Sequence, residues 1–343
     1  MKIDVMAGGL DLRRAQALAR DAAGGGFTGV VFTEGGRTAY LACAAAALAA
    51  DIDIATGIAV AFPRSPMVTA ETAWELADAS GGRFRLGIGT QVRAHIERRY
   101  SSPFDPPGPR LREYVLALRA VFAAFRGDAP LDFAGRFYPL SLLPGQWSPG
   151  PISVPDPPID IAAVNPWMLR MAGEVADGVH VHPLNTPTYL EETVRPNVAA
   201  GAAAAGRDAT RIQLMVPCFT APGDDEEERR PWREMARMQV AFYGSTPNYA
   251  FIFDQIGFEG TTARIRERQK AGDLAGMAAV VTDDILDHFV VSGTWDELPA
   301  RLAERYRGVD RVVLYFAGMA WMRDPASIER WGALAAATGA IAG

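Results

Sequence analysis

Short apolar runs rich in β-branched residues alternate with longer segments of helical spacing along most of the chain. This alternation is typical of repeated βα units around a parallel sheet. The predicted helices are Leu12–Ala19, capped by Asp11, Thr69–Ser80, Arg110–Phe125, Trp167–Ala176 and Trp295–Tyr306. The predicted strands are Lys2–Ala7, Gly29–Thr33, Ile52–Val60, Arg83–Ile88, Pro158–Ala163, Gly178–His182, Arg211–Pro217 and Asp310–Phe316.

The order of these elements favours a closed barrel over an open sheet. A doubly wound dinucleotide fold would carry Gly-x-Gly-x-x-Gly after its first strand, and the sequence has no such turn there. The nearest motif, Gly87-Ile88-Gly89, lacks the third glycine and belongs to the fourth strand. We therefore predict an α/β fold, a (β/α)8 TIM barrel that forms a single domain over residues 1–343, although the length alone would also allow two domains.

Two segments fall outside the regular units and are predicted to be loop insertions. Asp128–Pro157 is rich in proline and aromatic residues, and Phe133–Tyr138 within it has the pattern of a small hairpin. Tyr243–Lys270 mixes aromatic residues with glycine and charge. Long irregular segments in a compact domain are usually lids or binding loops. If each connects a strand to its following helix, both lie on the C-terminal face, where barrel enzymes place their active sites.

Composition excludes several classes of partner. Lys and Arg total 34 against 40 for Asp and Glu, and no basic run could neutralise a nucleic-acid backbone. No apolar run approaches the roughly 20 residues of a membrane span, and Met1–Val5 has the pattern of a first strand rather than a signal peptide. Cys43 and Cys218 support neither a disulfide framework nor a thiolate metal cluster. We therefore expect a cytoplasmic protein without a metal site.

Two stretches of sequence carry a specific resemblance. Thr56–Pro66 contains a Thr-Gly segment followed by Arg-x-Pro, and Leu76–Gln91 contains Ser-Gly-Gly-Arg-Phe before Leu-Gly-Ile-Gly. These motifs resemble those of the luciferase-like monooxygenase family. Ile161–Met168 and Ala172–Val179 are similar to the phosphate loop of that family and to the Ala-Asp-Gly that begins its sixth strand. The resemblance runs from Lys2 to about Arg211, more loosely to the last helix, and favours the branch that depends on the deazaflavin coenzyme F420.

The resemblance implies a cofactor site at the strand ends, which converge on one mouth in an α/β barrel. The planar ring of a flavin or deazaflavin needs close backbone approach, which Gly57 and Gly89 permit. The family commonly has a non-proline cis peptide at the place of Gly57-Ile58; an ordinary trans strand end is the alternative. The helix N-terminus after Asn165, where relatives often have glycine, would hold a phosphate. The expected cofactor-binding residues are Thr56, Gly57, Ile58, Gly89, Thr90, Gln91, Ala163, Val164, Asn165 and Pro166.

Two residues are candidates for the catalytic proton transfer. Glu34 directly follows the second strand and would lie at the mouth, where several relatives place a residue that faces the substrate. Its alternative role is to bond the turn amides of Gly35 and Gly36. His95 follows the fourth strand and is the second candidate, with a solvated charged loop as its alternative.

Further charged and aromatic groups surround these candidates. Arg93, Arg98 and Arg99 could bind the acidic tail of the coenzyme or the substrate. His180 and His182 alternate along the sixth strand and therefore share one of its faces, so that one could reach the mouth. No further ligand stands at suitable spacing, so a metal site is not expected there.

The leading functional hypothesis is an oxidoreductase that transfers a hydride between coenzyme F420 and a small organic substrate. The alternative is a monooxygenase that uses reduced flavin mononucleotide (FMN) and dioxygen, as alkanal monooxygenases do, with a separate reductase supplying the cofactor. A third reading is a cofactor-binding protein without turnover, in which Glu34 and His95 would be buried in structural bonds. The resemblance also implies a homodimer, whereas no nucleic acid or membrane is expected as a partner.

Overall fold

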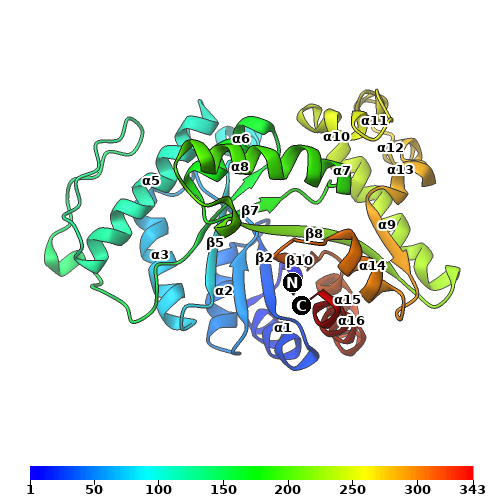
Figure 1. Ribbon diagram of the computed structural model, residues 1–343, viewed down its shortest axis with the longest axis horizontal. Helices are drawn as coiled ribbons and strands as arrows, with labels where there is room; N and C mark the ends of the chain where they lie inside the picture. Colours follow the sequence, from blue (N-terminus) through cyan, green and yellow to red (C-terminus); the bar gives the residue numbers. More distant parts are fainter. Residues whose placement is uncertain (343) are drawn as a thin grey trace.

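The computed structural model describes residues 1–342. It contains a closed barrel of eight parallel strands with helices between them, which confirms the predicted fold class (Figure 1). Strand β10 pairs with both β8 and β1 and thereby closes the ring. The barrel strands are β1 (Lys2–Gly8), β2 (Gly29–Thr33), β3 (Asp53–Thr56) with its continuation β4 (Ala59–Val60), β5 (Phe84–Gly89), β6 (Ile159–Ala163), β7 (Gly178–Val181), β8 (Gln213–Pro222) and β10 (Arg311–Leu314).

Most predicted strand ends are one or two residues from the observed ones, and three differences are larger. The predicted Ile52–Val60 is divided into β3 and β4 on either side of Gly57 and Ile58. Strand β8 continues to Pro222, five residues beyond the predicted end at Pro217. The additional strand β9 (Val290–Gly293) was missed because it is short and pairs only with this extension of β8, from Phe219 to Pro222.

Helices cover the outside of the barrel, and all five predicted helical segments are present. Helix α1 begins as expected, because Asp11 accepts the N–H of Arg14. Helix α3 begins three residues before the predicted Thr69, where Ser65 accepts the N–H of Val68. The helices are α1 (Leu12–Gly25), α2 (Ala39–Ala47), α3 (Pro66–Ala79), α4 (Arg93–Arg98), α5 (Pro107–Arg126), α6 (Pro166–Val175), α7 (Pro187–Tyr189), α8 (Arg195–Ala204), α9 (Glu226–Gly244), α10 (Ala250–Asp254), α11 (Thr261–Lys270), α12 (Leu274–Val280), α13 (Asp283–Asp287), α14 (Leu298–Arg305), α15 (Ala317–Arg323) and α16 (Ser327–Ala342). Shorter helical turns are η1 (Gly145–Trp147), η2 (Leu190–Val194), η3 (Ala209–Arg211) and η4 (Pro247–Tyr249).

The barrel interior is a packed core with a charged layer and an apolar layer. In the charged layer, Arg311 binds Asp4 through two hydrogen bonds of 2.7 and 2.8 Å, and Arg85 binds Asp160 at 2.9 and 2.6 Å. Pairing through two bonds compensates for burying these charges. The apolar layer above it, nearer the carboxyl ends, is a cluster of Met6, Val31, Ala55, Met215 and Val313, against which the partly buried Tyr315 packs. The apolar layer therefore forms the base on which any ligand at the mouth would rest.

The first insertion does not connect a strand to a helix. It joins the end of α5 to β6, so it leaves the barrel at the amino ends of the strands (Figure 1). Its predicted hairpin is present as a bridge between Phe133 and Leu140. The hairpin turn doubles back along α5, where Glu113 accepts the N–H groups of Arg136, Phe137 and Tyr138. This insertion therefore packs outside α5 rather than forming a strand-to-helix lid.

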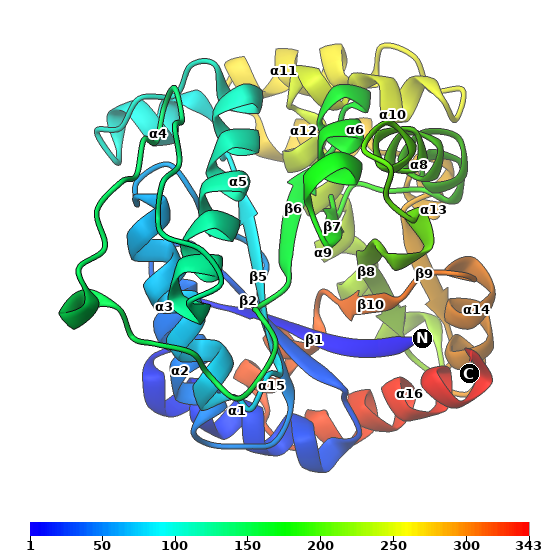
Figure 2. The ribbon, with the colours of Figure 1, turned by 60° about the vertical axis from the view of Figure 1, so that its left-hand side comes forward.

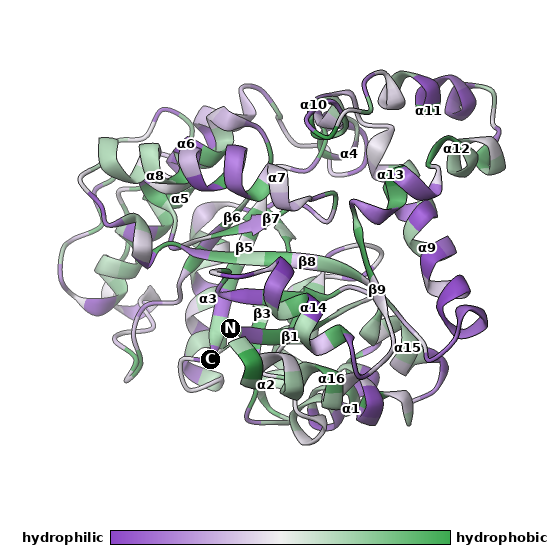
Figure 3. Ribbon diagram, turned by 45° about the vertical axis from the view of Figure 1, so that its right-hand side comes forward, coloured by the Kyte–Doolittle hydropathy of each residue, from purple (hydrophilic) through white to green (hydrophobic). Residues whose placement is uncertain are grey.

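The second insertion begins at the end of α9, the helix that follows β8, and lies on the expected face, but it is helical rather than irregular. Figure 2 shows α4, α10 and α11 at the end toward which β5 and β6 point. Good helix formers, Ala, Arg, Glu, Gln and Lys, dominate α11. Gly257 and Gly260, both at positive φ, separate it from α10. Hydrophilic residues concentrate on α9 and α11, whereas the barrel strands are hydrophobic (Figure 3).

Within residues 1–342, no helix has the length and apolar character needed to cross a membrane.

Candidate active site at the carboxyl ends of the strands

Three of the predicted cofactor-binding residues, Gly57, Ile58 and Gly89, form a close-packed apolar floor with Ala162. A Cβ atom at Gly89 would lie 3.0 Å from Cδ1 of Ile58 and 3.2 Å from Cβ of Ala162. A Cβ atom at Gly57 would lie 2.2 Å from Cγ1 of Val31. Both glycines are therefore close-packed positions, and the ends of β3, β5 and β6 meet at one mouth as predicted. The peptide bond between Gly57 and Ile58 is cis, which confirms the expectation drawn from the resemblance.

Thr56 is completely buried beneath this floor. Its hydroxyl donates to the carbonyl oxygen of Gly87 at 2.7 Å and accepts the N–H of the same residue at 2.9 Å. The hydroxyl therefore joins β3 to β5, and only the backbone of Thr56 is left for the expected cofactor contact.

Thr90 and Gln91 form the turn between β5 and α4. Gln91 has a φ of 56°, in the left-handed region that residues other than glycine rarely adopt. Its side-chain oxygen accepts the N–H of Val92 at 2.9 Å, and the Thr90 hydroxyl donates to the Gln91 carbonyl at 3.0 Å. The two side chains thus stabilise a turn that lies immediately beyond Gly89.

The turn after β6 contains Ala163, Val164, Asn165 and Pro166. The Oδ1 atom of Asn165 accepts the N–H of Met168 at 3.0 Å and so caps α6, while Pro166 contributes no N–H. This cap uses the side-chain oxygen of Asn165 and leaves its Nδ2 group available to donate. The backbone N–H of Trp167 has no partner in the described chain. Two donors therefore remain at the positive end of the α6 dipole.

Glu34 lies directly after β2, as predicted, but in a closed environment. Its Oε1 accepts from Arg64 at 2.5 Å, and its Oε2 accepts from Arg64 at 3.0 Å and from the N–H of Val60 at 2.7 Å. The side chain is only 4% exposed. Since both oxygens are engaged, the geometry does not support the expected proton-transfer role. Glu34 instead attaches β4 and the chain before α3 to the end of β2.

His95 lies on the short helix α4 and is exposed to solvent. Arg99 donates to the Gly35 carbonyl at 2.7 Å and so ties the end of α4 to the turn after β2. Arg93 donates to Asp105 at 2.6 Å, which occupies part of its guanidinium, while Arg98 is exposed. The proton role of His95 and the tail-binding role of these arginines stay predictions.

The two histidines of β7 have distinct surroundings. His180 lies inside the barrel between Gly57 and Gly87, with Nε2 unpaired within residues 1–342 and 3.7 Å from Asp160. Burial lowers its pKa to about 4, so its ring is neutral near pH 7. His182 is one step nearer the mouth and partly buried. Its Nδ1 accepts the N–H of Leu184 at 3.1 Å, and burial lowers its pKa to about 3, so the neutral ring carries its proton on Nε2.

An aromatic wall of His182, Tyr243, Tyr249 and Tyr315 lies beside these strand ends. The ring centroid of His182 lies 4.7 Å from that of Tyr243 and 4.5 Å from that of Tyr249. The hydroxyls of Tyr243 and Tyr315 are 2.8 Å apart, and Tyr315 also donates to Oε1 of Gln239 at 3.4 Å. Burial raises the pKa of both tyrosines, which keeps their hydroxyls protonated.

The sequence reasoning expected that one of His180 and His182 could reach the mouth, but it named none of the three tyrosines of this wall as site residues. Tyr315 could have been found, since it continues the alternation of Arg311 and Val313 toward the mouth. Tyr243 gives no such signal, because it belongs to the end of α9 and reaches Tyr315 only through the tertiary fold.

Two cavities lie away from the mouth. One, of about 790 Å³, is bounded by η4, α10 and α11, and another, of about 780 Å³, lies among charged residues of α9, α13 and α14. Neither is lined by Gly57, Gly89 or Asn165. Within residues 1–342, no group of three or more His, Cys, Asp or Glu side chains is arranged to hold a metal ion.

Comparison with known proteins gives a consistent picture. The model of the family described as luciferase-like monooxygenase matches residues 2–311. An uncharacterized protein of Mycobacterium bovis is 38% identical over 266 residues, 77% of this chain and 78% of that protein. The 5,10-methylenetetrahydromethanopterin reductase of Archaeoglobus fulgidus is 30% identical over 270 residues, 76% of each chain.

Solved structures share the whole fold at low sequence identity. The coenzyme F420 dependent tetrahydromethanopterin reductase from Methanopyrus kandleri has a TM-score of 0.76 at 21% identity, over 96% of this chain and 97% of that one. The oxygenating constituent of a 3,6-diketocamphane monooxygenase from Pseudomonas putida, in complex with FMN, has a TM-score of 0.65 at 16% identity, over 98% and 97% of the two chains.

Proposed function

Because the chain belongs to the luciferase-like monooxygenase family, we propose that it binds coenzyme F420 at its barrel mouth and transfers a hydride between that coenzyme and a small organic substrate. Family membership confirms the resemblance seen in the sequence and makes the chain an oxidoreductase. The similarity to an F420-dependent reductase over 96% of the chain supports the choice of coenzyme. The observation that carries the proposed site is the floor of Gly57, Ile58, Gly89 and Ala162.

The floor fits one face of a planar ring system. A Cβ atom at Gly89 would stand 3.0 Å from Cδ1 of Ile58, so a side chain there would displace Ile58 and disturb the floor. We assign the cofactor-binding role to this end of the strands, with Gly57, Ile58, Gly89, Thr90 and Gln91 as the proposed contacts. Thr56 acts through its buried bonds to Gly87, which fix the two strands that bear the floor.

The turn from Ala163 to Pro166 fits the phosphate of the coenzyme. Asn165 Nδ2 and the N–H of Trp167 are the two free donors at this helix N-terminus. The Asn165 cap orients the amide so that its nitrogen faces away from the helix. A glycine at this position, as in relatives, lets the backbone come close to the phosphate. Here the side-chain amide of Asn165 would donate a hydrogen bond to the phosphate instead.

The bound coenzyme would supply hydride chemistry, whereas the protein would handle the proton. Hydride transfer to a carbonyl carbon leaves negative charge on its oxygen, and the reverse reaction removes a proton from an alcohol. The hydroxyls of Tyr243 and Tyr315 are protonated donors at the mouth, and Nε2–H of His182 is a third. We assign the proton role to the tyrosine pair, with His95 as the exposed alternative in place of Glu34.

The remaining expectations concern the setting of the enzyme. We propose that it acts in the cytoplasm as a homodimer on a small-molecule substrate. Light scattering on the purified chain tests the dimer: a mass near twice 36.9 kDa supports it, and a mass near that of one chain contradicts it.

A titration of the purified protein with F420 and, separately, with FMN tests the proposed function. We expect F420 to bind more tightly and its oxidised absorbance to bleach on addition of a substrate alcohol without dioxygen. Tight binding of FMN with no detectable binding of F420 would refute the proposal.

The second candidate is a monooxygenase that uses reduced FMN supplied by a separate reductase. The similarity to an FMN-bound monooxygenase favours it. The same floor and phosphate turn would serve FMN, since both cofactors carry a three-ring system and a proximal phosphate. Oxygen consumption dependent on reduced FMN and substrate separates this candidate from the first.

A further inference from the structure

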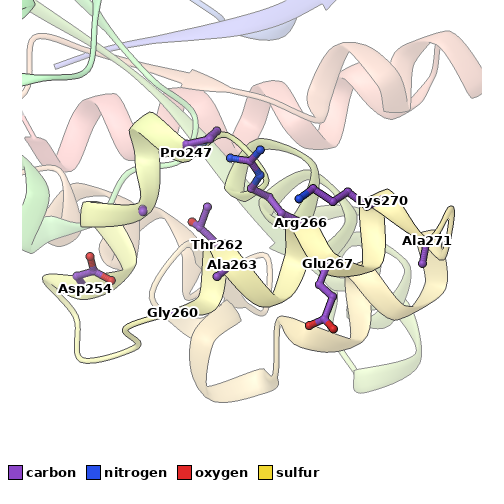
Figure 4. A pocket seen from close by; sticks show the side chains of 10 residues that line it. Pro247, Asp254, Gly260, Thr262, Ala263, Arg266, Glu267, Lys270 and Ala271 are labelled. Atoms are coloured by element: carbon purple, nitrogen blue, oxygen red, sulfur yellow. The ribbon is translucent and has the colours of Figure 1, made fainter.

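The cavity between η4, α10 and α11 has no role in the site described above. Its volume is about 790 Å³. Figure 4 shows its lining, in which Thr262, Arg266 and Lys270 project from one side of α11 toward Pro247. The spacing of four residues places these three side chains one above the other along the helix. One row of the cavity wall is therefore a hydroxyl followed by two cations.

Thr262 is only 5% exposed, yet its hydroxyl has no hydrogen-bond partner within residues 1–342. A buried hydroxyl without a partner costs free energy, so native proteins rarely retain one without a reason. In Figure 4 the Thr262 side chain extends from α11 into the space below Pro247. This hydroxyl is the second, independent indication that the cavity takes a polar ligand.

The two cations are also free of protein partners. No hydrogen bond or ion pair of the Arg266 or Lys270 side chain occurs in the described part of the chain. Their neighbours on α11 behave differently, since Arg264 donates to the Thr261 hydroxyl at 2.9 Å and Arg268 lies 3.5 Å from Asp273. Like charges four residues apart repel each other unless an anion lies between them. Arg266 and Lys270 are thus arranged for a ligand that supplies negative charge.

The start of α11 adds backbone donors to the same cavity. Gly260 precedes the helix at a φ of +74° and provides no side-chain cap. The N–H groups of Thr262 and Ala263 have no acceptor within residues 1–342. They point along the helix dipole toward the cavity end that Gly260 and Ala263 line. The carboxylates of Asp254 and Glu267 lie on the opposite side from the cations in Figure 4 and would repel an anion placed there.

We propose that this cavity is an anion-binding site that takes a phosphate or carboxylate group. The Thr262 hydroxyl and the free amides would bind one part of the group, and Arg266 and Lys270 would neutralise its charge.

The short element η4 links this cavity to the barrel mouth. The ring of Tyr249, at the end of η4, packs against His182 with the ring centroids 4.5 Å apart, while Pro247 and Ala250, on either side of Tyr249 in the chain, line the cavity. An anionic group here could belong to the substrate or, if the proposed function holds, to the acidic tail of the coenzyme. Either source would present negatively charged acceptor oxygens to Thr262, Arg266 and Lys270.

Calorimetric titration with inorganic phosphate and with a γ-linked triglutamate tests the site without any coenzyme, so its outcome is independent of the proposed function. We expect at least one probe to bind and its affinity to fall with ionic strength. Arg266→Gln and Lys270→Gln should each lower that affinity about tenfold, the usual effect of losing one charge-assisted bond. Arg268→Gln, on the same helix but outside the cavity, is the matched control and should leave the affinity unchanged.

Thr262→Val provides the second test. Because the hydroxyl has no protein partner, its loss should leave the unfolding temperature unchanged or raise it, while the affinity for the anion falls. Binding of phosphate alone would point to a phosphorylated substrate, and binding of triglutamate would point to the coenzyme tail. Absence of binding by both probes, or equal affinities in the wild type, Thr262→Val and Arg266→Gln, would overturn the proposal.

Discussion

Arg64 holds the carboxylate of Glu34 through two hydrogen bonds of 2.5 and 3.0 Å, across the turn that carries the cis Gly57-Ile58 peptide. The N–H of Val60 adds a third bond to the same carboxylate. The residue that the sequence marked as a candidate for proton transfer is therefore held as an anchor of the mouth.

Glu34→Ala should destabilise the protein by about 3 kcal/mol, because it leaves the partly buried Arg64 without its counter-ion. Denaturant unfolding measures this loss, and the shape-conserving Glu34→Gln should recover part of it. Full stability of Glu34→Gln combined with loss of turnover would instead restore the acid–base role predicted from the sequence.

Gly89→Ala tests the floor. The new Cβ would press on Cδ1 of Ile58 at 3.0 Å and on Cβ of Ala162 at 3.2 Å. We expect the affinity for the coenzyme to fall about tenfold or more, in line with the about 1–3 kcal/mol that overpacking a close contact costs. Gly24→Ala is the control, since no atom lies within 4 Å of a Cβ at that helical position. Unchanged coenzyme affinity in Gly89→Ala would place the ring elsewhere.

The pKa of His180 predicts how stability depends on pH. Burial lowers this pKa to about 4 from the usual 6.5, so the unfolded chain binds a proton more readily than the native state between these values. The free energy of unfolding should therefore fall as the pH decreases from about 6.5 to about 4, by up to about 3 kcal/mol from this residue. Of the charged groups that face the ring, Asp160 raises the pKa of His180 and Arg85 lowers it.

Unfolding curves at several pH values check this expectation. His180→Leu should show a flatter dependence than the wild type between pH 6.5 and 4. Equal slopes in the wild type and His180→Leu would show that His180 titrates normally in the native protein.

Much of the barrel was predictable because most strands are short, largely buried apolar runs bounded by turn residues. Strand β2 was predicted with its observed ends, Gly29 and Thr33, and β6 began one residue later than predicted. Strand β9 was not predictable, since Val290–Gly293 is short and forms only by pairing with a β8 longer than its apolar run indicated.

The site was predicted less completely, for a different reason. Glycines at strand ends carry a local signal, so the position of Gly57 and Gly89 at one mouth followed from the order of the strands. The partner of Glu34 is 30 residues away, and that of Tyr315 is 72 residues away. Such pairs form through the tertiary fold, and neither spacing nor composition marks them.

The paired hydroxyls of Tyr243 and Tyr315 provide the last prediction. If they handle the proton during hydride transfer, Tyr315→Phe should lower kcat at least tenfold, the scale that a positioned acid or base contributes, with little change in the affinity for the coenzyme. Tyr243→Phe should act in the same direction, because it removes the partner of Tyr315 at 2.8 Å.

Tyr249→Phe is the matched control, since Tyr249 belongs to the same aromatic wall through its ring contact with His182. Single-turnover bleaching of the bound coenzyme measures the chemical step directly. Equal rates in the wild type and Tyr315→Phe, with His95→Ala slowed instead, would transfer the proton role to the exposed histidine of α4.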